Sequence, residues 1–284
     1  MSKQNRLLAR LEKEARNVRR DIVRIITRAG EGHIGPALSC VDILCVLYFE
    51  ILRVDPNQPN WEERDRVILS KGHGCTALYS VLARRGFFPV EELSTYGKTG
   101  TIFGGHPDRG MVYGVEVSTG SLGHGLSLGA GMALAAKVDH KDYRVIVILS
   151  DGECQEGSTW EGAMFARMHK LDNLTAIVDR NGFQAIGRTE DIVSIEPFRE
   201  KWEAFGWSTR EVNGHNYEEL LDTLNQIPFK KGLPSVIIAH TVKGKGVSFM
   251  ENKEIWHAKV PSDEEFKQAM LELGKRDNSE VYEK

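Results

Sequence analysis

Two apolar segments that each run into polar residues decide the expected fold. RVIVIL at 144–149 leads into Ser150-Asp151-Gly152, and LTAIV at 174–178 leads into Asp179-Arg180-Asn181-Gly182-Phe183. Both segments are short and apolar on both faces, as buried strands of a parallel sheet should be. A segment with helical periodicity, Thr159–His169, separates them. This alternation predicts an α/β fold, a mostly parallel sheet with helices on both faces.

The rest of the chain repeats the alternation. Further strands are expected at Arg66–Leu69, Ser208–Val212 and Ser235–His240, each apolar on both faces or nearly so. Helices are expected at Leu7–Thr27, Ser39–Leu52 with a cap at Ser39, Cys75–Arg85, Leu122–Ala136, Pro197–Phe205 and Tyr217–Ile227. No repeat or Pro/Ser-rich linker divides the chain, so we expect one domain over residues 1–274 and a polar tail at 275–284.

Composition excludes several classes of protein. The 284 residues are 41% hydrophobic and 27% charged, which is typical of a globular protein and not of a disordered or fibrous one. A net charge of −3 gives no global positive field for nucleic acid or an anionic membrane. No apolar run approaches the roughly 18 residues of a membrane span. The basic N-terminus lacks the apolar core of a signal peptide, and the four cysteines are scattered, so we expect a cytoplasmic protein with reduced thiols.

Five of the nine histidines have a glycine neighbour in segments expected to be loops: His33, His73, His106, His124 and His215. Glycine lets backbone approach a ligand closely. The loops at His73 and His124 lead into expected helices, whose N-termini favour anions. Each histidine could instead cap or pack a turn. A zinc site made of histidines alone is a further alternative, although no HxxxH or HExxH pair supports it.

The residues that follow the expected strands at 144–149 and 174–178 make up half of a candidate site for a hard cation. Asp151 follows one strand and Asn181 follows the next, at the edge where parallel sheets bind ligands. A carboxylate, an amide oxygen and a loop carbonyl suit Mg²⁺ or Ca²⁺ and leave positions for water and phosphate oxygens. The alternative is that Asp151 caps a helix and Asn181-Gly182 is an ordinary turn.

The glycine-rich stretch GSLGHGLSLGAG at 120–131 matches neither of the two common nucleotide-binding motifs. The chain has no GxxxxGK[ST], and this stretch neither fits GxGxxG nor follows an evident strand. Gly125, Gly129 and Gly131 are expected within a helix, where each costs up to about 1 kcal/mol relative to alanine unless close packing compensates. Another backbone therefore presses against this helix, from either the sheet or a second subunit.

Taken together, the motifs resemble the N-terminal, diphosphate-binding domain of transketolase. The spacing of Asp151-Gly152 and Asn181 is similar to the thiamine diphosphate motif GDG followed by NN. In chain order, the matching words are GHIG, SKGHG, GGHPD, STGSLGHG, DGECQEGSTWEGA, DRNGFQAIG, TVKGKGVSFMEN and WHAK. The resemblance covers residues 10 to 262 and implies a thiamine diphosphate-binding fold.

The resemblance also implies roles for individual residues. Asp151, Asn181 and the carbonyl of Phe183 would hold Mg²⁺, with Ca²⁺ a possible substitute, while Gly152 would let backbone reach the diphosphate. The four catalytic, proton-handling candidates are His73 and His257, near diphosphate and substrate, and His33 and His106, facing the sugar hydroxyls. Three further positions would contribute to the cofactor site: Gly120 and Leu122 at the aminopyrimidine, and Glu156 as a buried glutamate at a dimer interface.

The sequence departs from the family pattern in residues and in length. Ser150 replaces the first Gly of GDG, Arg180 replaces the first Asn of NN, and His124 stands where many relatives have Gln. A full transketolase continues with a pyrimidine-binding domain and a third domain. We therefore expect the N-terminal subunit of a split transketolase, inactive alone and completed by a C-terminal subunit carrying the pyrimidine-binding domain in an α2β2 assembly.

The expected reaction is transfer of a two-carbon ketol unit from a ketose, phosphorylated as in the pentose phosphate pathway, to an aldose acceptor. Histidine suits proton transfer in both directions near neutral pH. Two alternatives remain open at this stage. One is another thiamine diphosphate ketol transferase or a 1-deoxyxylulose-5-phosphate synthase-like enzyme. The other is a regulatory relative that has lost the chemistry.

Overall fold

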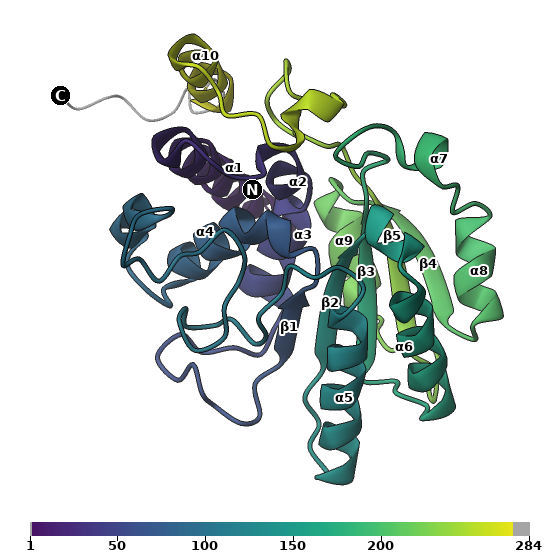
Figure 1. Ribbon diagram of the computed structural model, residues 1–284. Coiled ribbons are helices and arrows are strands. Elements are labelled where there is room, and N and C mark those ends of the chain that lie inside the picture. The colour runs from purple at the N-terminus through teal and green to yellow at the C-terminus, as the bar shows by residue number, and fades with distance from the viewer. Residues whose placement is uncertain (1, 275–284) are drawn as a thin grey trace.

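The computed structural model describes residues 2–274 and contains a five-stranded parallel sheet in the order β1-β2-β3-β5-β4 (Figure 1). The strands are β1 Arg66–Leu69, β2 Val145–Ser150, β3 Leu174–Arg180, β4 Ser208–Asn213 and β5 Ser235–His240. The predicted parallel α/β fold is confirmed, and two of the five strands, β1 and β5, have the predicted bounds.

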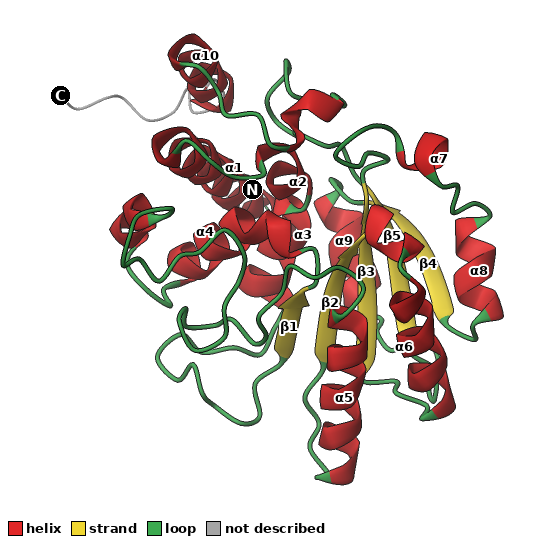
Figure 2. Ribbon diagram, viewed as in Figure 1, coloured by secondary structure: helices red, strands yellow, loops and turns green. Residues whose placement is uncertain are grey.

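Helices cover both faces of the sheet (Figure 2). Alternate residues of β2 point to opposite faces, as the period of two in a strand requires. Ile146 and Ile148 pack with one cluster of buried side chains, and Val145, Val147 and Leu149 pack with the other. The first cluster draws on α1, α3, α4 and α9, and the second draws on α5, α6 and α8.

Most helices lie within a few residues of their predicted positions. The long ones are α1 Lys3–Ala29, α4 Cys75–Arg85, α5 Gly125–Val138, α6 Gly157–Met168, α9 Tyr217–Leu224 and α10 Asp263–Gly274. The short ones are α2 Ile34–Ser39, α3 Val41–Val46, α7 Thr189–Ile192 and α8 Phe198–Ala204. A π-helical turn, η1 Leu47–Ile51, and four 3₁₀ turns, η2 Gly72–Gly74, η3 Val90–Thr95, η4 Gly152–Gln155 and η5 Glu254–His257, complete the elements.

Two predictions about elements were wrong, and one long helix was missed. The single helix expected over Ser39–Leu52 is divided, and Ser39 is the last residue of α2, because its hydroxyl donates to Asp179 at 2.6 Å, with the Pro36 carbonyl 3.0 Å away, instead of capping the next turn. Strand β4 is an edge strand and only Val212 in it is buried, so it is not apolar on both faces. Helix α10 was not predicted; it packs against α1 through the buried Ala269 and Leu273.

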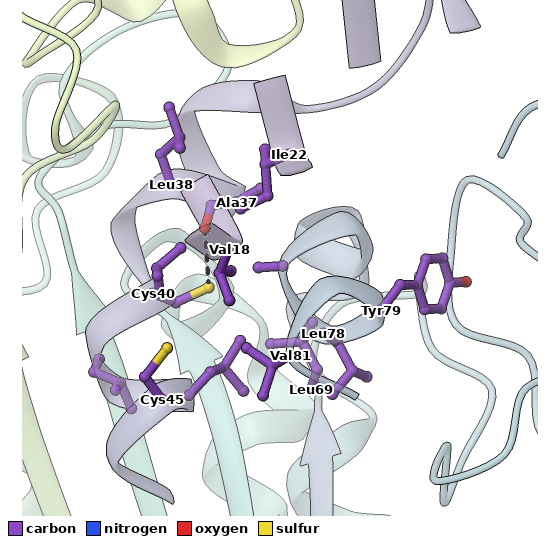
Figure 3. Close-up of a cluster of buried hydrophobic side chains, with 14 of the residues drawn as sticks. Val18, Ile22, Ala37, Leu38, Cys40, Cys45, Leu69, Leu78, Tyr79 and Val81 are labelled. Atoms are coloured by element: carbon purple, nitrogen blue, oxygen red, sulfur yellow. Dashed lines mark hydrogen bonds between the residues drawn. The ribbon is translucent and has the colours of Figure 1, made fainter. Parts of the chain in front are cut away.

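The core on the α1 side of the sheet also supports a loop that carries a predicted site residue. Val18 and Ile22 from α1 meet Leu78 and Val81 from α4 (Figure 3). Tyr79 points away from these side chains in the same view. Its hydroxyl donates to the carbonyls of Gly104 at 3.1 Å and His106 at 2.8 Å, so the core fixes the GGHPD loop.

The structure shows which residues pack against the glycines of helix α5. A Cβ at Gly129 would lie 2.5 Å from Val147 of β2, and one at Gly125 would collide with Ser70. Gly131 has no atom within 4 Å of such a Cβ. The sheet therefore explains Gly129, the loop after β1 explains Gly125, and Gly131 faces outward.

The structure describes the four cysteines and the helices, but not the predicted tail. All four cysteines are free and buried, as predicted. No helix within residues 2–274 combines the length and the apolar character needed to cross a bilayer. The polar tail predicted at 275–284 lies outside the described residues.

Candidate active site

The carboxyl ends of β2 and β3 bring Asp151 and Asn181 to one edge of the sheet, as predicted. The register pairs Ser150 with Asp179, so Asp151 and Asn181 follow directly in adjoining loops. The N–H of Gly182 donates to Oδ2 of Asp151 at 2.7 Å, and that of Gly152 donates to Oδ1 at 2.8 Å. The two loops are therefore tied together through the Asp151 carboxylate.

The environment of Asp151 fits a bound cation. Its side chain is 1% exposed, and burial, reinforced by the nearby Asp179 carboxylate, raises its pKa despite the two N–H donors. No lysine, arginine or histidine of residues 2–274 forms an ion pair with it. A buried carboxylate without a cationic partner is costly, and a divalent metal would remove that cost.

The other predicted ligands lie beside it. Asn181 is buried, and its Oδ1 accepts the N–H of Phe183 at 3.1 Å. Within the described chain, no three His, Cys, Asp or Glu side chains are grouped so as to hold a metal ion. A metal at this edge would therefore take amide and carbonyl oxygens together with Asp151, which is the donor set of a hard cation.

A buried ion pair that sequence reasoning missed lies beneath this edge. Lys71 and Asp179 are both fully buried and form a short ion pair. Asp179 also accepts from Ser39 Oγ at 2.6 Å and from the hydroxyl of Thr241, while Lys71 Nζ donates to the Pro36 carbonyl at 2.9 Å. Burial alone would raise the pKa of Asp179, but Lys71 and the two hydroxyls lower it overall. The available signal for Asp179 was a carboxylate directly after the mostly apolar run Leu174–Val178, in the same buried strand.

Glu153 is a second buried carboxylate that was not predicted. It accepts the N–H groups of Gly123 at 2.9 Å and Ser150 at 3.2 Å, and the hydroxyl of Ser70. These bonds join the loop before α5 to the loops after β1 and β2. The side chain thereby fixes the position of the GSLGHG loop relative to Asp151.

Four predicted histidines form one cluster, although they come from four separate segments of the chain. The ring of His33 lies 5.6 Å from that of His73, 6.1 Å from that of His106 and 5.4 Å from that of His257, measured between centroids. The rings of His73 and His257 stack at 5.5 Å. The structure thus brings all four together; their roles stay predictions.

Three rings of the cluster, those of His33, His73 and His257, are held in the neutral form. Burial, the neighbouring Lys243 and then His33 lower the pKa of His257 to about 3. Burial, Lys71 and the other histidines lower the pKa of His73, and burial, His106 and Lys243 lower that of His33. The buried Nδ1 of His33 has no hydrogen-bond partner within the described residues. Neutral rings with free nitrogen atoms can accept protons and hold hydroxyl groups.

Lys243 joins the cluster and was also missed. Its Nζ lies 3.1 Å from Nδ1 of His257 and donates to the Gln184 carbonyl at 2.7 Å. Burial and the nearby Lys71 lower its pKa to about 8. The sequence carried a signal in TVKGKG, where a lysine between a buried strand and a glycine could have been recognised as a site residue.

The predicted backbone contact points lie next to the cluster. Gly120 has φ +142°, and a Cβ there would lie 2.9 Å from the His106 ring. A Cβ at Gly152 would lie 3.0 Å from the Gln184 side chain. Leu122 is half-buried, and Glu156, at the N-cap of α6, is exposed in this chain. At both positions a side chain would collide with a neighbouring residue, so glycine lets the His106 ring and the Gln184 side chain pack closely against the backbone.

Two of the five glycine-flanked histidines lie outside the cluster. His124 precedes α5 and its Nδ1 lies 3.0 Å from the carbonyl of Leu122, two residues earlier. His215 contacts Asp42 and the backbone of Val242. His124 therefore fits the alternative interpretation, in which a glycine-flanked histidine packs a turn.

Comparison with known proteins identifies the family. Residues 11–283 match the family model described as the thiamine diphosphate binding domain of transketolase. The chain belongs to the transketolase family. One relative, from Phocaeicola vulgatus, is named as a subunit of apulose-4-phosphate transketolase; it is 46% identical over 266 residues, which cover 94% of each chain. The 6-deoxy-6-sulfo-D-fructose transketolase subunit SqwG of Clostridium sp. is 43% identical over 265 residues, which cover 93% of this chain and 96% of that one.

Solved transketolases share the fold. Transketolase from Campylobacter jejuni superposes with a TM-score of 0.87 at 33% identity, over 93% of this chain and 42% of that chain. The sheet, its flanking helices and the edge at Asp151 therefore belong to the thiamine diphosphate-binding domain of this family. For this transketolase-family chain, the cofactor assignment predicted from the motifs is confirmed at the level of the domain.

The two side chains that depart from the family motif have partners of their own. Ser150 accepts the N–H of Glu153 at 3.2 Å through its hydroxyl and belongs to the turn after β2. Arg180 pairs with Glu190 at 3.2 Å and with Glu196, which directs its guanidinium toward the α7 segment. Neither side chain takes the place of Asp151 or Asn181.

Proposed function

We propose that this chain is the N-terminal subunit of a split transketolase. It would transfer a two-carbon ketol unit from a phosphorylated ketose to an aldose, using thiamine diphosphate and Mg²⁺. A C-terminal subunit carrying the pyrimidine-binding domain would complete two sites in an α2β2 assembly. Two relatives named as transketolase subunits match along 94% and 96% of their own lengths, whereas a solved transketolase chain is matched over 42%, which supports this arrangement.

The metal and cofactor ligands of this proposal follow from the edge of the sheet. The Asp151 carboxylate, the Asn181 amide oxygen and the Phe183 carbonyl would hold Mg²⁺, or Ca²⁺ in its place. Gly152, Gly120 and Leu122 would contact the cofactor with backbone, His73 and His257 would contact its diphosphate, and Glu156 would lie at the subunit interface. The observation that carries the proposal is the buried Asp151, held by the Gly182 N–H and without a cationic partner within residues 2–274.

The histidine cluster would handle the protons of the reaction. Thiamine diphosphate, when bound, stabilises the negative charge that develops as the ketose C2–C3 bond breaks. The rings of His33, His106 and His257 would hold the substrate hydroxyls and take up the proton of the hydroxyl next to that bond. The lowered pKa values of His33 and His257 keep those two rings neutral before the proton arrives. Lys243 donates toward His257 and would keep that ring oriented.

The names of the relatives bear on substrate and setting. One is named for a ketose phosphate and another for a sulfo-sugar, so both named substrates carry an anionic group. We propose a phosphorylated ketose donor and a role in cytoplasmic carbohydrate metabolism of the pentose phosphate type. The C-terminal partner would supply much of the clamp that holds the phosphate of that donor.

Reconstitution tests the proposal. The chain would be mixed with a candidate C-terminal subunit, thiamine diphosphate and Mg²⁺, and ketol transfer from ketose phosphates to aldoses would be followed by product analysis. We expect transfer with both chains together and none with either alone. Full activity of this chain alone, or none in a stable complex supplied with several ketose donors, would contradict the proposal.

A further inference from the structure

The segment that follows β5 carries Lys243, and hydrogen bonds from several elements fix its backbone. The N–H of Thr241 donates to the Arg180 carbonyl at 3.1 Å, and the N–H of Gly244 donates to the Gly35 carbonyl at 3.1 Å. Between them, the N–H of Val242 donates to Nε2 of His215 at 2.8 Å. In this series His215 is the only acceptor supplied by a side chain, and it was one of the glycine-flanked histidines that the active site left unexplained.

His215 is itself held by a buried carboxylate. Its Nδ1 lies 2.7 Å from Oδ2 of Asp42. The Val242 N–H can only donate, so Nε2 is the acceptor and Nδ1 carries the hydrogen that points to Asp42. Asp42 also accepts from Arg19 at 2.6 and 3.0 Å and from the Tyr217 hydroxyl at 2.5 Å, which leaves it no freedom to turn.

Arg19 provides a second contact with the same segment. Its Nε donates to the Lys245 carbonyl at 3.0 Å, while its two terminal nitrogens bind Asp42. Arg19, Asp42 and His215, named here the Asp42 unit, therefore hold one backbone atom on each side of Lys243. Arg19 and Asp42 are 6% and 3% exposed, so little water competes for these bonds.

We propose that the Asp42 unit positions Lys243 for catalysis. By fixing the backbone from Val242 to Lys245, it keeps the Lys243 amine between the Gln184 carbonyl and His257. This inference rests on the proposed function, because positioning matters to turnover only if the histidine cluster is the active site. The three residues of the unit are positioning residues, since none of them belongs to the cluster.

Hydrogen exchange of single amides tests the backbone claim without any catalysis. His215→Phe keeps a ring of similar size and removes both hydrogen bonds, whereas His215→Gln retains an acceptor within reach of Val242. The matched control is His240→Phe on β5, because His240 is exposed and bonds to Glu211 at the sheet edge instead of to this segment. If His215→Phe does not fold, the flexible His215→Met gives the same comparison with His215→Gln.

We expect the Val242 amide to exchange about tenfold faster in His215→Phe, the factor that follows from losing one hydrogen bond. His215→Gln and His240→Phe should exchange at the wild-type rate there, and amides of β1 to β3 should be unaffected in all variants. An unchanged rate at Val242, or faster exchange spread evenly over all five strands, would overturn the inference.

The reconstituted two-subunit enzyme supplies the second readout. We expect kcat/KM for ketol transfer to fall in His215→Phe and to be restored in His215→Gln, while thermal unfolding changes little between these two variants. Faster exchange at Val242 with unaltered kcat/KM would overturn the positioning role. If the wild-type complex transfers no ketol unit, the proposed function fails, and the exchange data alone then decide whether the unit fixes the segment.

Discussion

Asp151 and Asp179 are two buried carboxylates at the ends of neighbouring strands. They differ in their hydrogen-bond and ion-pair partners, and their pKa values shift in opposite directions. Asp179 has the ammonium of Lys71 and two hydroxyl donors, and its pKa is lowered. Asp151 has two backbone N–H donors and forms no ion pair within the described chain, and burial raises its pKa although the more distant Arg180 opposes this. The comparison separates a carboxylate that a buried cation neutralises from one that forms no ion pair within the described residues and that we propose as a metal ligand.

The histidine cluster resembles Asp151, because it also contains a polar atom that has no partner within the described residues. Lowered pKa values keep the rings of His33, His73 and His257 neutral, and Nδ1 of His33 has no hydrogen-bond partner within residues 2–274. Most buried polar groups of a folded protein have a hydrogen-bond partner, and a group without one is a candidate for contact with a ligand where it lies in a site. Changes to the Lys71–Asp179 group should therefore affect stability, and changes to Asp151 or the histidines should affect binding and turnover.

The largest effect on stability is expected from Asp179→Ala. The change leaves the fully buried ammonium of Lys71 without its charge partner, which typically lowers the free energy of unfolding by about 3–5 kcal/mol. Urea unfolding followed by circular dichroism measures this. A loss below about 1 kcal/mol would place Asp179 in the same class as Asp151 and break the comparison.

A histidine substitution should change turnover without changing stability. His257→Ala in the reconstituted enzyme should lower kcat by about 10²–10⁴-fold, the usual contribution of a positioned acid or base. The unfolding midpoint of the isolated chain should stay near that of the wild type, because His257 is not part of the satisfied network. His169→Ala, on an exposed ring beyond α6, is the matched control. Wild-type kcat in His257→Ala would remove this residue from the mechanism.

A smaller stability effect is expected from one of the hydroxyl donors to Asp179. Ser39→Ala removes a 2.6 Å hydrogen bond to a buried charge and should cost about 1.5–3 kcal/mol. Thiamine diphosphate affinity of the assembled enzyme should stay unchanged, since the ion pair remains. A drop in cofactor affinity larger than the drop in stability would show that Asp179 serves the site directly.

The two carboxylates also predict opposite dependences on pH. Asp179 has a lowered pKa, so its stabilising contribution is present above the unfolded value of about 3.9 and is lost as the pH falls through the folded pKa. Asp151 has a raised pKa, so its contribution is greatest below that unfolded value and is lost as the pH rises through the folded pKa. In EDTA, Asp151→Asn should therefore gain stability over the wild type at neutral pH, and the gain should vanish in acid. A pH-independent difference would contradict this assignment.

The sequence predicted those parts of the molecule in which local pattern and tertiary structure agree. Strands β1 and β5 and helix α4 have the predicted bounds because apolar runs and periodicity decide them locally. The proximity of Asp151 and Asn181 was predictable because neighbouring parallel strands end at the same edge of the sheet. The four histidines met as the family resemblance implied, although nothing in their separation along the chain would have shown it.

The parts that were missed depend on contacts between distant segments. Lys71 and Asp179 are 108 residues apart in the chain, and neither position shows by itself that the other neutralises it. Strand β4 is polar because it lies at the edge of the sheet, a place that only the strand order reveals. Lys243 was missed because it lies in a segment whose backbone bonds to distant parts of the chain, at Arg180, Gly35 and His215.

The central claim is that Asp151 is a buried carboxylate waiting for a cofactor-bound metal, and titration calorimetry tests it most directly. Thiamine diphosphate with Mg²⁺ would be titrated into the assembled enzyme carrying wild-type Asp151 or Asp151→Asn. We expect the variant to bind at least about tenfold more weakly while its metal-free stability is equal or higher. Equal affinity in the two proteins would contradict the account.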